Sequence, residues 1–71
     1  MKRNFAENLQ RLRMEKGYTQ QQLAKLVSVD RSSITRWETG SRVPDLILLA
    51  RLADCLGVDP SALLQDRKSV V

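Results

Sequence analysis

The sequence predicts an all-α domain built from five short helices. Apolar residues recur at spacings of three and four along most of the chain, which is the pattern of one buried helical face. The stretches with this pattern are separated by residues that begin helices and by glycines that end them. No stretch alternates polar and apolar residues for long enough to suggest a strand. A chain of 71 residues is long enough for one domain with a modest core.

The first two expected helices span about residues 4–16 and 20–27. Gly17 ends the first helix, because glycine adopts the left-handed conformation found at helix C-termini. Thr19 begins the second helix, and Gln22 follows three residues later as in a capping box. Their expected buried residues are Phe5, Leu9 and Leu12 in the first helix, and Leu23, Ala24 and Val27 in the second.

The other three helices are expected over about residues 31–38, 46–56 and 60–64. Each follows an aspartate that can cap it, and the last begins with a proline, which suits the first helical position. A loop over residues 40–44 separates the third helix from the fourth. The expected caps and ends are Asp30, Asp45 and Asp59 at the beginnings, and Gly40 and Gly57 at two of the ends.

The composition indicates an anionic partner and excludes several kinds of site. The net charge is +4 and the isoelectric point is about 9.8, which is typical of chains that meet nucleic acid and also of many that do not. Cys55 is the only cysteine and there is no histidine, so neither a disulfide nor a zinc site is expected. We expect no metal and no cofactor, and Cys55 is expected to fill space as a small apolar residue.

The distribution of apolar residues predicts neither a signal peptide nor a membrane span. The basic N-terminal segment contains no continuous apolar run. The longest apolar run covers residues 46–50, far short of the length that crosses a bilayer. With its single cysteine, the chain is therefore expected to be soluble and cytoplasmic.

The third helix is expected to present one polar face suited to reading DNA. At about 100° per residue, Ile34 and Trp37 fall on the side opposite a polar group. Arginine can donate two hydrogen bonds to guanine, while serine and threonine can bond either kind of base edge. A solvated polar face is the alternative, and it is the commoner one for an arbitrary helix. The four outward residues are Arg31, Ser32, Thr35 and Arg36.

With the helix over residues 20–27 before it and a turn of about three residues between, the segment over 19–39 has the outline of a helix-turn-helix. It lies within the string NLQRLRMEKGYTQQQLAKLVSVDRSSITRWETGSRVPDLILLARLADCLGVDPSALL, which resembles the phage-repressor and Cro-like family, also called the Xre family. The matching features are Thr-Gln at the start of the second helix, Ile-x-x-Trp-Glu-x-Gly around the end of the third, and a later Leu-Gly-Val.

The resemblance implies a compact five-helix lambda-repressor-like DNA-binding domain. It would occupy residues 1–66, with residues 67–71 as a frayed C-terminal tail. The implied function is sequence-specific binding of a double-stranded DNA operator by a transcriptional regulator. The sequence shows no activated nucleophile arrangement, no paired catalytic carboxylates at identifiable spacing and no phosphate loop, so an enzyme is not expected. The alternative to a regulator is an antitoxin or adaptor that uses the same fold to bind an unknown protein partner.

The resemblance also assigns roles within the expected DNA surface. The base-reading positions are the four outward residues of the third helix. The positions that contact phosphate are Thr19, Gln20, Ser41 and Arg42, and a helix N-terminus with free amide groups suits that role at Gln20. Solvated side chains at Gln20 and Arg42 are the alternative.

Arg13 and Glu38 resemble a family ion pair that joins the first helix to the end of the third. A carboxylate near a helix C-terminus is disfavoured by the helix dipole, and a guanidinium partner would offset that penalty. Two unpaired surface charges are the alternative. The family often has glycine where this chain has Ser28, so Ser28 is expected to adopt a left-handed conformation or to alter the turn.

The fourth helix is expected to combine a buried stripe with an association surface. Its stripe is predicted to contain Leu46, Leu49, Ala53 and Leu56. Aliphatic residues off that stripe can mark an interface between protein copies, although scattered surface residues are the alternative. A homodimer would place two reading helices about 34 Å apart, one turn of B-DNA. The expected interface residues are Ile47, Leu48, Leu63 and Leu64.

Overall fold

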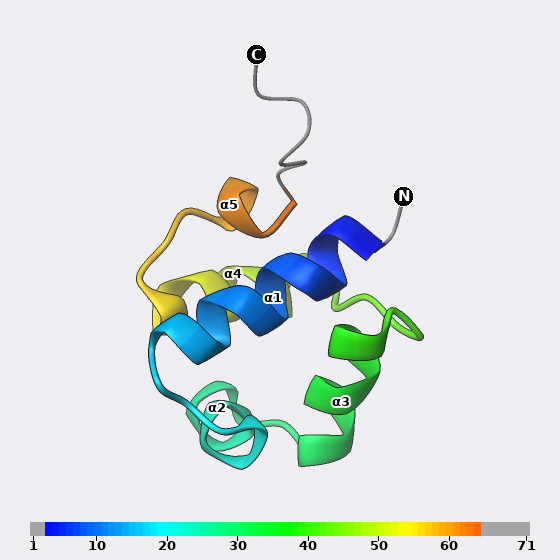
Figure 1. Cartoon of the computed structure of the whole chain (residues 1–71), viewed down its shortest axis with the longest axis vertical. Coiled ribbons are helices and arrows are strands. Elements are labelled where there is room, and N and C mark those ends of the chain that lie inside the picture. Colours follow the sequence, from blue (N-terminus) through cyan, green and yellow to red (C-terminus); the bar gives the residue numbers. More distant parts are fainter. Residues whose placement is uncertain (1–2, 65–71) are drawn as a thin grey trace.

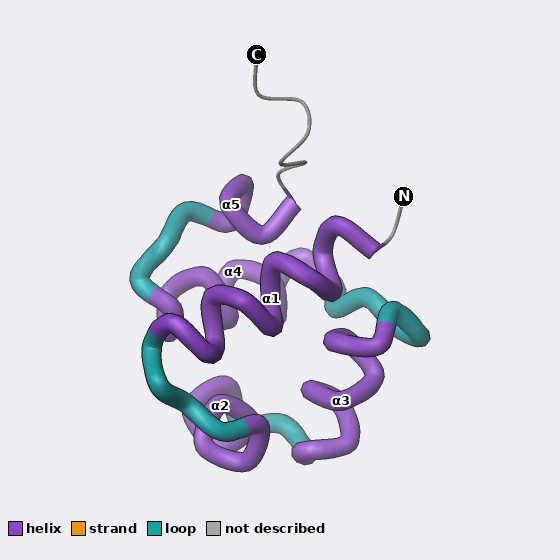
Figure 2. Tube along the Cα trace, in the orientation of Figure 1, coloured by secondary structure: helices purple, strands orange, loops and turns teal. Residues whose placement is uncertain are grey.

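The structure is a computed structural model that describes residues 3–64. It contains no strand in this part of the chain (Figures 1 and 2), which confirms the prediction of an all-α domain. The predicted helices agree with the observed ones to within one residue at each end. The residues of the expected tail, 67–71, lie outside the described part. The helices are α1 (Arg3–Glu15), α2 (Gln20–Val27), α3 (Arg31–Thr39), α4 (Leu46–Leu56) and α5 (Pro60–Leu64).

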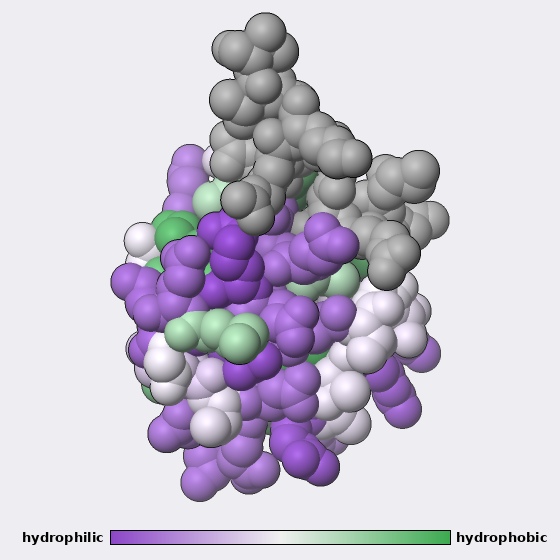
Figure 3. All heavy atoms as spheres, viewed as in Figure 1, coloured by the Kyte–Doolittle hydropathy of each residue, from purple (hydrophilic) through white to green (hydrophobic). Residues whose placement is uncertain are grey.

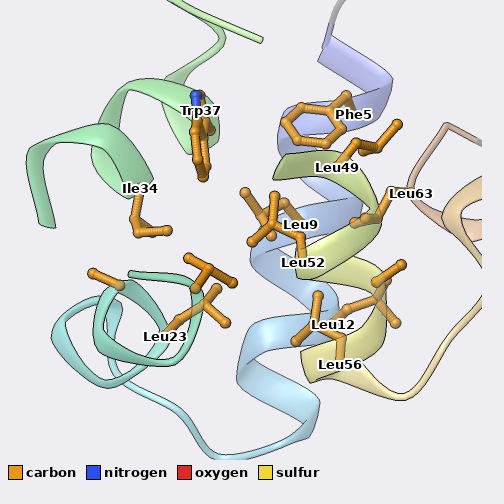
Figure 4. Packing of buried hydrophobic residues seen from close by; sticks show 13 residues of the cluster. Phe5, Leu9, Leu12, Leu23, Ile34, Trp37, Leu49, Leu52, Leu56 and Leu63 are labelled. Atoms are coloured by element: carbon orange, nitrogen blue, oxygen red, sulfur yellow. The ribbon is translucent and has the colours of Figure 1, made fainter. Parts of the chain in front are cut away.

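One hydrophobic core joins all five helices. Helix α1 packs against α3 and α5, α2 packs against α3 and α4, and α4 packs against α5. Ile34 and Trp37 point from α3 toward the leucines of α1 and α4 (Figure 4). Burying one such side chain stabilises the fold by about 1.5–3 kcal/mol, so α3 is held on the domain by its inner face. The fully buried large side chains are Leu9, Leu23, Val27, Ile34, Leu52, Leu56 and Leu63.

The prediction for the buried stripe of α4 was wrong at Leu46, whose exposed fraction is 82%. Burial begins one turn later, at Leu49, and continues through Leu52, Ala53 and Leu56. Helical spacing identifies residues that share a face, but it does not tell where the neighbouring helices end. The first turn of α4 therefore presents Leu46 to the surface.

A buried side chain links the two ends of the described chain. Asn8 of α1 is only 2% exposed, and its side-chain amide donates a 2.9 Å hydrogen bond to the backbone oxygen of Leu63 in α5. Its Oδ1 accepts a hydrogen bond from Arg11. Because buried polar groups are costly without partners, the bond from Asn8 to Leu63 helps to fix α5 on α1.

The helix ends follow from local chemistry. The capping box of Thr19 and Gln22 is formed in both directions, and Asp45 Oδ1 accepts a hydrogen bond from Leu48 N at 2.9 Å. Asp30 occupies the N-cap position of α3, but its side chain makes no capping bond. Ser28 ends α2 in the left-handed conformation, with φ 63° and ψ 46°, as expected from its position in the turn.

We expect Ser28→Gly to stabilise the domain. A residue with a side chain in the left-handed region costs about 1–2 kcal/mol, and glycine removes this cost. Glycine also loses more conformational entropy on folding than serine does, so the net gain in stability is smaller than the strain removed. Urea unfolding is therefore expected to show a gain of about 0.5–1 kcal/mol. The matched control is Ser32→Gly in α3, where glycine is less favourable and stability falls by about 0.5 kcal/mol. Equal losses in both variants would contradict strain at Ser28.

Cys55 is half-buried and packs against the core, in agreement with its expected space-filling role. Its Sγ lies 3.7 Å from the backbone oxygen of Leu26. Burial first, and the neighbouring Asp54 second, raise the pKa of the thiol, while Arg51 opposes the shift. The thiol is therefore protonated at neutral pH and is a weak nucleophile.

Among residues 3–64, no helix is long and apolar enough to cross a membrane.

Candidate DNA interface

The polar residues of α3 form a continuous exposed face. Arg31, Ser32, Thr35 and Arg36 are all exposed, while Ile34 and Trp37 on the opposite side are buried. The structure therefore brings the four predicted reading residues together. We call these four residues the reading face.

The expected ion pair between α1 and α3 is present and nearly buried. Arg13 Nε lies 2.5 Å from Glu38 Oε2, and Arg13 Nη2 donates to Glu38 Oε1 at 3.1 Å. The exposed fractions of the two side chains are 11% and 3%. Arg13 also donates to the backbone oxygen of Tyr18 at 2.8 Å. One guanidinium thus joins α1, the connection to α2 and the end of α3.

Gln20 extends this cluster to the reading face. Its Nε2 donates a 3.0 Å hydrogen bond to Glu38 Oε1, and its Oε1 accepts a 3.0 Å hydrogen bond from the hydroxyl of Thr35. Sequence reasoning expected Gln20 at a phosphate and missed these contacts. The capping box does place Gln20 in the first turn of α2, but its distance from α3 depends on how the two helices pack.

The N-terminus of α2 retains donors for an anion. Thr19 Oγ1 accepts a hydrogen bond from Gln22 N at 3.0 Å, and Gln22 Oε1 accepts one from Thr19 N at 2.8 Å. The backbone N–H groups of Gln20 and Gln21 have no acceptor among the described residues. Free amides at a helix N-terminus attract phosphate.

Hydrogen bonds to one backbone carbonyl of α3 hold the start of the loop that follows this helix. The backbone oxygen of Arg36 accepts hydrogen bonds from the N–H groups of Gly40, Ser41 and Arg42. The side chain of Ser41 lies 3.1 Å from that of Thr39, and both Ser41 and Arg42 are exposed. Arg42 and Arg36 line the same shallow hollow between α3 and the loop. The loop therefore carries its polar side chains beside the reading face.

The predicted association surface is only partly available. Leu63 was expected there, but its side chain is completely buried in the core, so that prediction was wrong. Leu48 is half-buried and packs against the core, whereas Ile47 and Leu64 are 69% and 53% exposed. The pattern of a five-residue helix was too short to tell Leu63 from Leu64.

Exposed apolar residues instead gather where the loop enters α4. Val43, Leu46 and Ile47 are all more than half exposed. In the view of Figure 3, which has α1 in front, most of the described surface is hydrophilic and the apolar groups on it are small. We call Val43, Leu46 and Ile47 the α4 apolar patch.

The comparison with protein families decides the classification. Residues 9–63 match the model of a helix-turn-helix family, HTH_3. The chain belongs to this family.

Within residues 3–64, no cluster of potential ligands for a metal ion is present.

Named relatives of this helix-turn-helix protein are transcriptional regulators. It is 38% identical over 61 residues to the SPbeta prophage-derived uncharacterized HTH-type transcriptional regulator YonR of Bacillus subtilis (strain 168), and this match covers 86% of the chain and 56% of YonR. It is 34% identical over 58 residues to the uncharacterized HTH-type transcriptional regulator YqaF of the same strain, with coverages of 82% and 76%. The chain thus spans little more than half of YonR.

A solved structure also resembles this helix-turn-helix chain closely. The restriction-modification controller protein C.AhdI from Aeromonas hydrophila superposes with a TM-score of 0.83 at 35% identity. The superposition covers 87% of this chain and 94% of C.AhdI. Fold, family match and relatives therefore agree that the chain is a helix-turn-helix domain.

Proposed function

We propose that the chain binds an operator with α3 in the major groove and acts by occupying its site, without enzymatic activity. The observation that carries this proposal is the reading face, which is exposed while the other side of α3 is fixed in the core. Arg31 and Arg36 would donate to guanine, and Ser32 and Thr35 would contact neighbouring bases. In bacteria, a regulator of this kind meets DNA in the cytoplasm.

Phosphate contacts would position the reading face on the duplex. At one side, Thr19 has a hydroxyl proton to donate, and Gln20 contributes its free backbone amide. At the other side, Ser41 and Arg42 project from the loop after α3. Such contacts fix the register but carry no sequence information, so discrimination falls to the side chains of α3.

Replacing Arg36 with alanine is expected to weaken binding to the preferred site by about 1–3 kcal/mol and to relax discrimination at one base pair. Binding to random DNA should change much less and should weaken steeply as salt is added, because phosphate contacts release counterions. Fluorescence anisotropy with selected and random duplexes measures both effects. The matched control is Arg51→Ala, an exposed arginine on α4.

Unchanged DNA affinity in both Arg31→Ala and Arg36→Ala would contradict the proposal. In that case the reading face would have no role in binding DNA. The chain would then be better described as an antitoxin or adaptor for a protein partner.

The α4 apolar patch supports a homodimer on a palindromic operator. Three exposed aliphatic side chains lie within five consecutive positions of the chain, and burying them against a second copy would remove their contact with water. Leu64 is also exposed and could contribute. Two copies would double the DNA contacts and present two reading faces about 34 Å apart.

Ile47→Glu is expected to raise the dimer dissociation constant by at least about tenfold, because it places a charge inside an apolar interface. Sedimentation equilibrium over micromolar concentrations measures this constant. Met14→Glu is the control, since Met14 is also an exposed apolar residue but lies on α1. A wild-type protein that stays monomeric at high micromolar concentration, both free and on DNA, would rule out the dimer.

A further inference from the structure

The hydroxyl of Thr35 is the last group in a chain of hydrogen bonds that begins at the buried ion pair. The chain runs from Arg13 through Glu38 and Gln20 to Thr35. It therefore joins the interior of the domain to the reading face. Each group in it has a limited capacity to donate or accept, so the direction of every bond can be worked out.

Glu38 fixes the donor-to-acceptor direction of the hydrogen bonds at its end of this series. A carboxylate has no proton, so it can only accept hydrogen bonds. It accepts from Arg13 and from Gln20, whose side chain lies 3.0 Å from Glu38 Oε1. Gln20 must therefore turn its NH2 group toward Glu38 and its amide oxygen toward α3.

The amide oxygen of Gln20 in turn fixes the hydroxyl of Thr35. Thr35 Oγ1 lies 3.0 Å from Gln20 Oε1 and 3.2 Å from the backbone oxygen of Arg31. Both neighbours are acceptors, and a hydroxyl has one proton. Whichever oxygen receives that proton, none remains for a base in the groove.

We propose that Thr35 acts only as a hydrogen-bond acceptor toward DNA and accepts from the exocyclic amino group of one base. In the major groove, such groups are adenine N6 and cytosine N4. This inference rests on the proposed function, because it assigns one residue's preference within the reading face. Gln20 and Glu38 are positioning residues that act through Thr35.

Ser32 provides a comparison on the same helix. It is exposed, and its hydroxyl has no hydrogen-bond partner among the described residues. A hydroxyl that is free to rotate can donate or accept. Ser32 therefore tolerates either kind of base edge, whereas the contacts of Thr35 impose one direction.

The first step of the test locates the base that Thr35 meets. Preferred sites are selected from random DNA with the wild type, Thr35→Val and Ser32→Ala. Valine keeps the shape of threonine but removes its hydroxyl. We expect one base pair to lose its preference in T35V and to keep it in S32A. The amino group of that pair belongs to its adenine or to its cytosine.

The second step removes the amino group itself. Purine replaces adenine, or pyrimidin-2-one replaces cytosine, in a duplex that carries the selected site. The wild type is expected to bind the altered duplex about 3- to 10-fold more weakly, as for one lost hydrogen bond. T35V should bind the two duplexes equally, and this comparison cancels any effect of the analogue on the duplex.

Two results would overturn the inference. The first is that T35V affects no position, and the second is an equal penalty from the analogue in wild type and T35V. In both, salt-dependent binding to DNA persists. A folded wild-type protein that binds no DNA would instead reject the proposed function, and with it this inference.

Discussion

Replacing Arg13 with leucine is expected to lower the free energy of unfolding by about 3–5 kcal/mol, because a buried carboxylate is left without its partner. The side chain of Glu38 is only 3% exposed, so water can do little to solvate its charge where it lies. Since a one-domain protein is stable by only about 5–15 kcal/mol, this loss is a large part of the total. Urea unfolding followed by Trp37 fluorescence measures it.

The double variant separates loss of the pair from loss of packing. Arg13→Leu combined with Glu38→Leu removes both charges, and we expect it to recover much of the stability that either single change loses. Glu15→Ala is the surface control. Its ion pair with Arg11 is exposed, so its removal should cost less than about 1 kcal/mol. Strictly additive losses in the double variant would argue against a coupled pair.

The same pair has a consequence for recognition. Glu38 also accepts a hydrogen bond from Gln20, which contacts Thr35, so the ion pair supports both the attachment of α3 and the hydrogen bonding of the reading face. In the proposed function, the buried ion pair would therefore help to orient Thr35 toward DNA.

Much of the fold could be predicted because its signals are local. Thr19 and Asp45 each accept a hydrogen bond from the third amide of the helix that follows, and glycines end α1, α3 and α4 in the left-handed conformation. The orientation of the reading face followed from the angle between successive residues of α3, since Ile34 and Trp37 define the buried side. These features need no knowledge of distant segments.

Contacts between segments set the limit of sequence reasoning. Asn8 donates across 55 positions to Leu63, and Gln20 meets Thr35 only because α2 packs against α3. Neither pair of residues has a separation in the sequence that would predict its contact. Leu46 was misplaced for a related reason, because its burial depends on which helices extend over the first turn of α4.

The clearest consequence of these long-range contacts is expected at α5. Leu63→Ala should destabilise the domain by about 2–5 kcal/mol, the usual cost of emptying a fully buried leucine site. Leu64→Ala, at the next position, should change stability by about 0.5 kcal/mol or less, because that side chain is 53% exposed. Thermal unfolding at protein concentrations below dimer formation compares the two variants.

The comparison tests which leucine belongs to the core and which is free for association. A loss at Leu63 would weaken the attachment of α5 to α1, which also includes the hydrogen bond from Asn8 to the Leu63 backbone. Equal losses in the two variants would contradict the observed register of α5. If only Leu63→Ala destabilises the monomer, Leu64 remains available to a second copy, and α5 then serves the core with one side chain and the proposed dimer with the next.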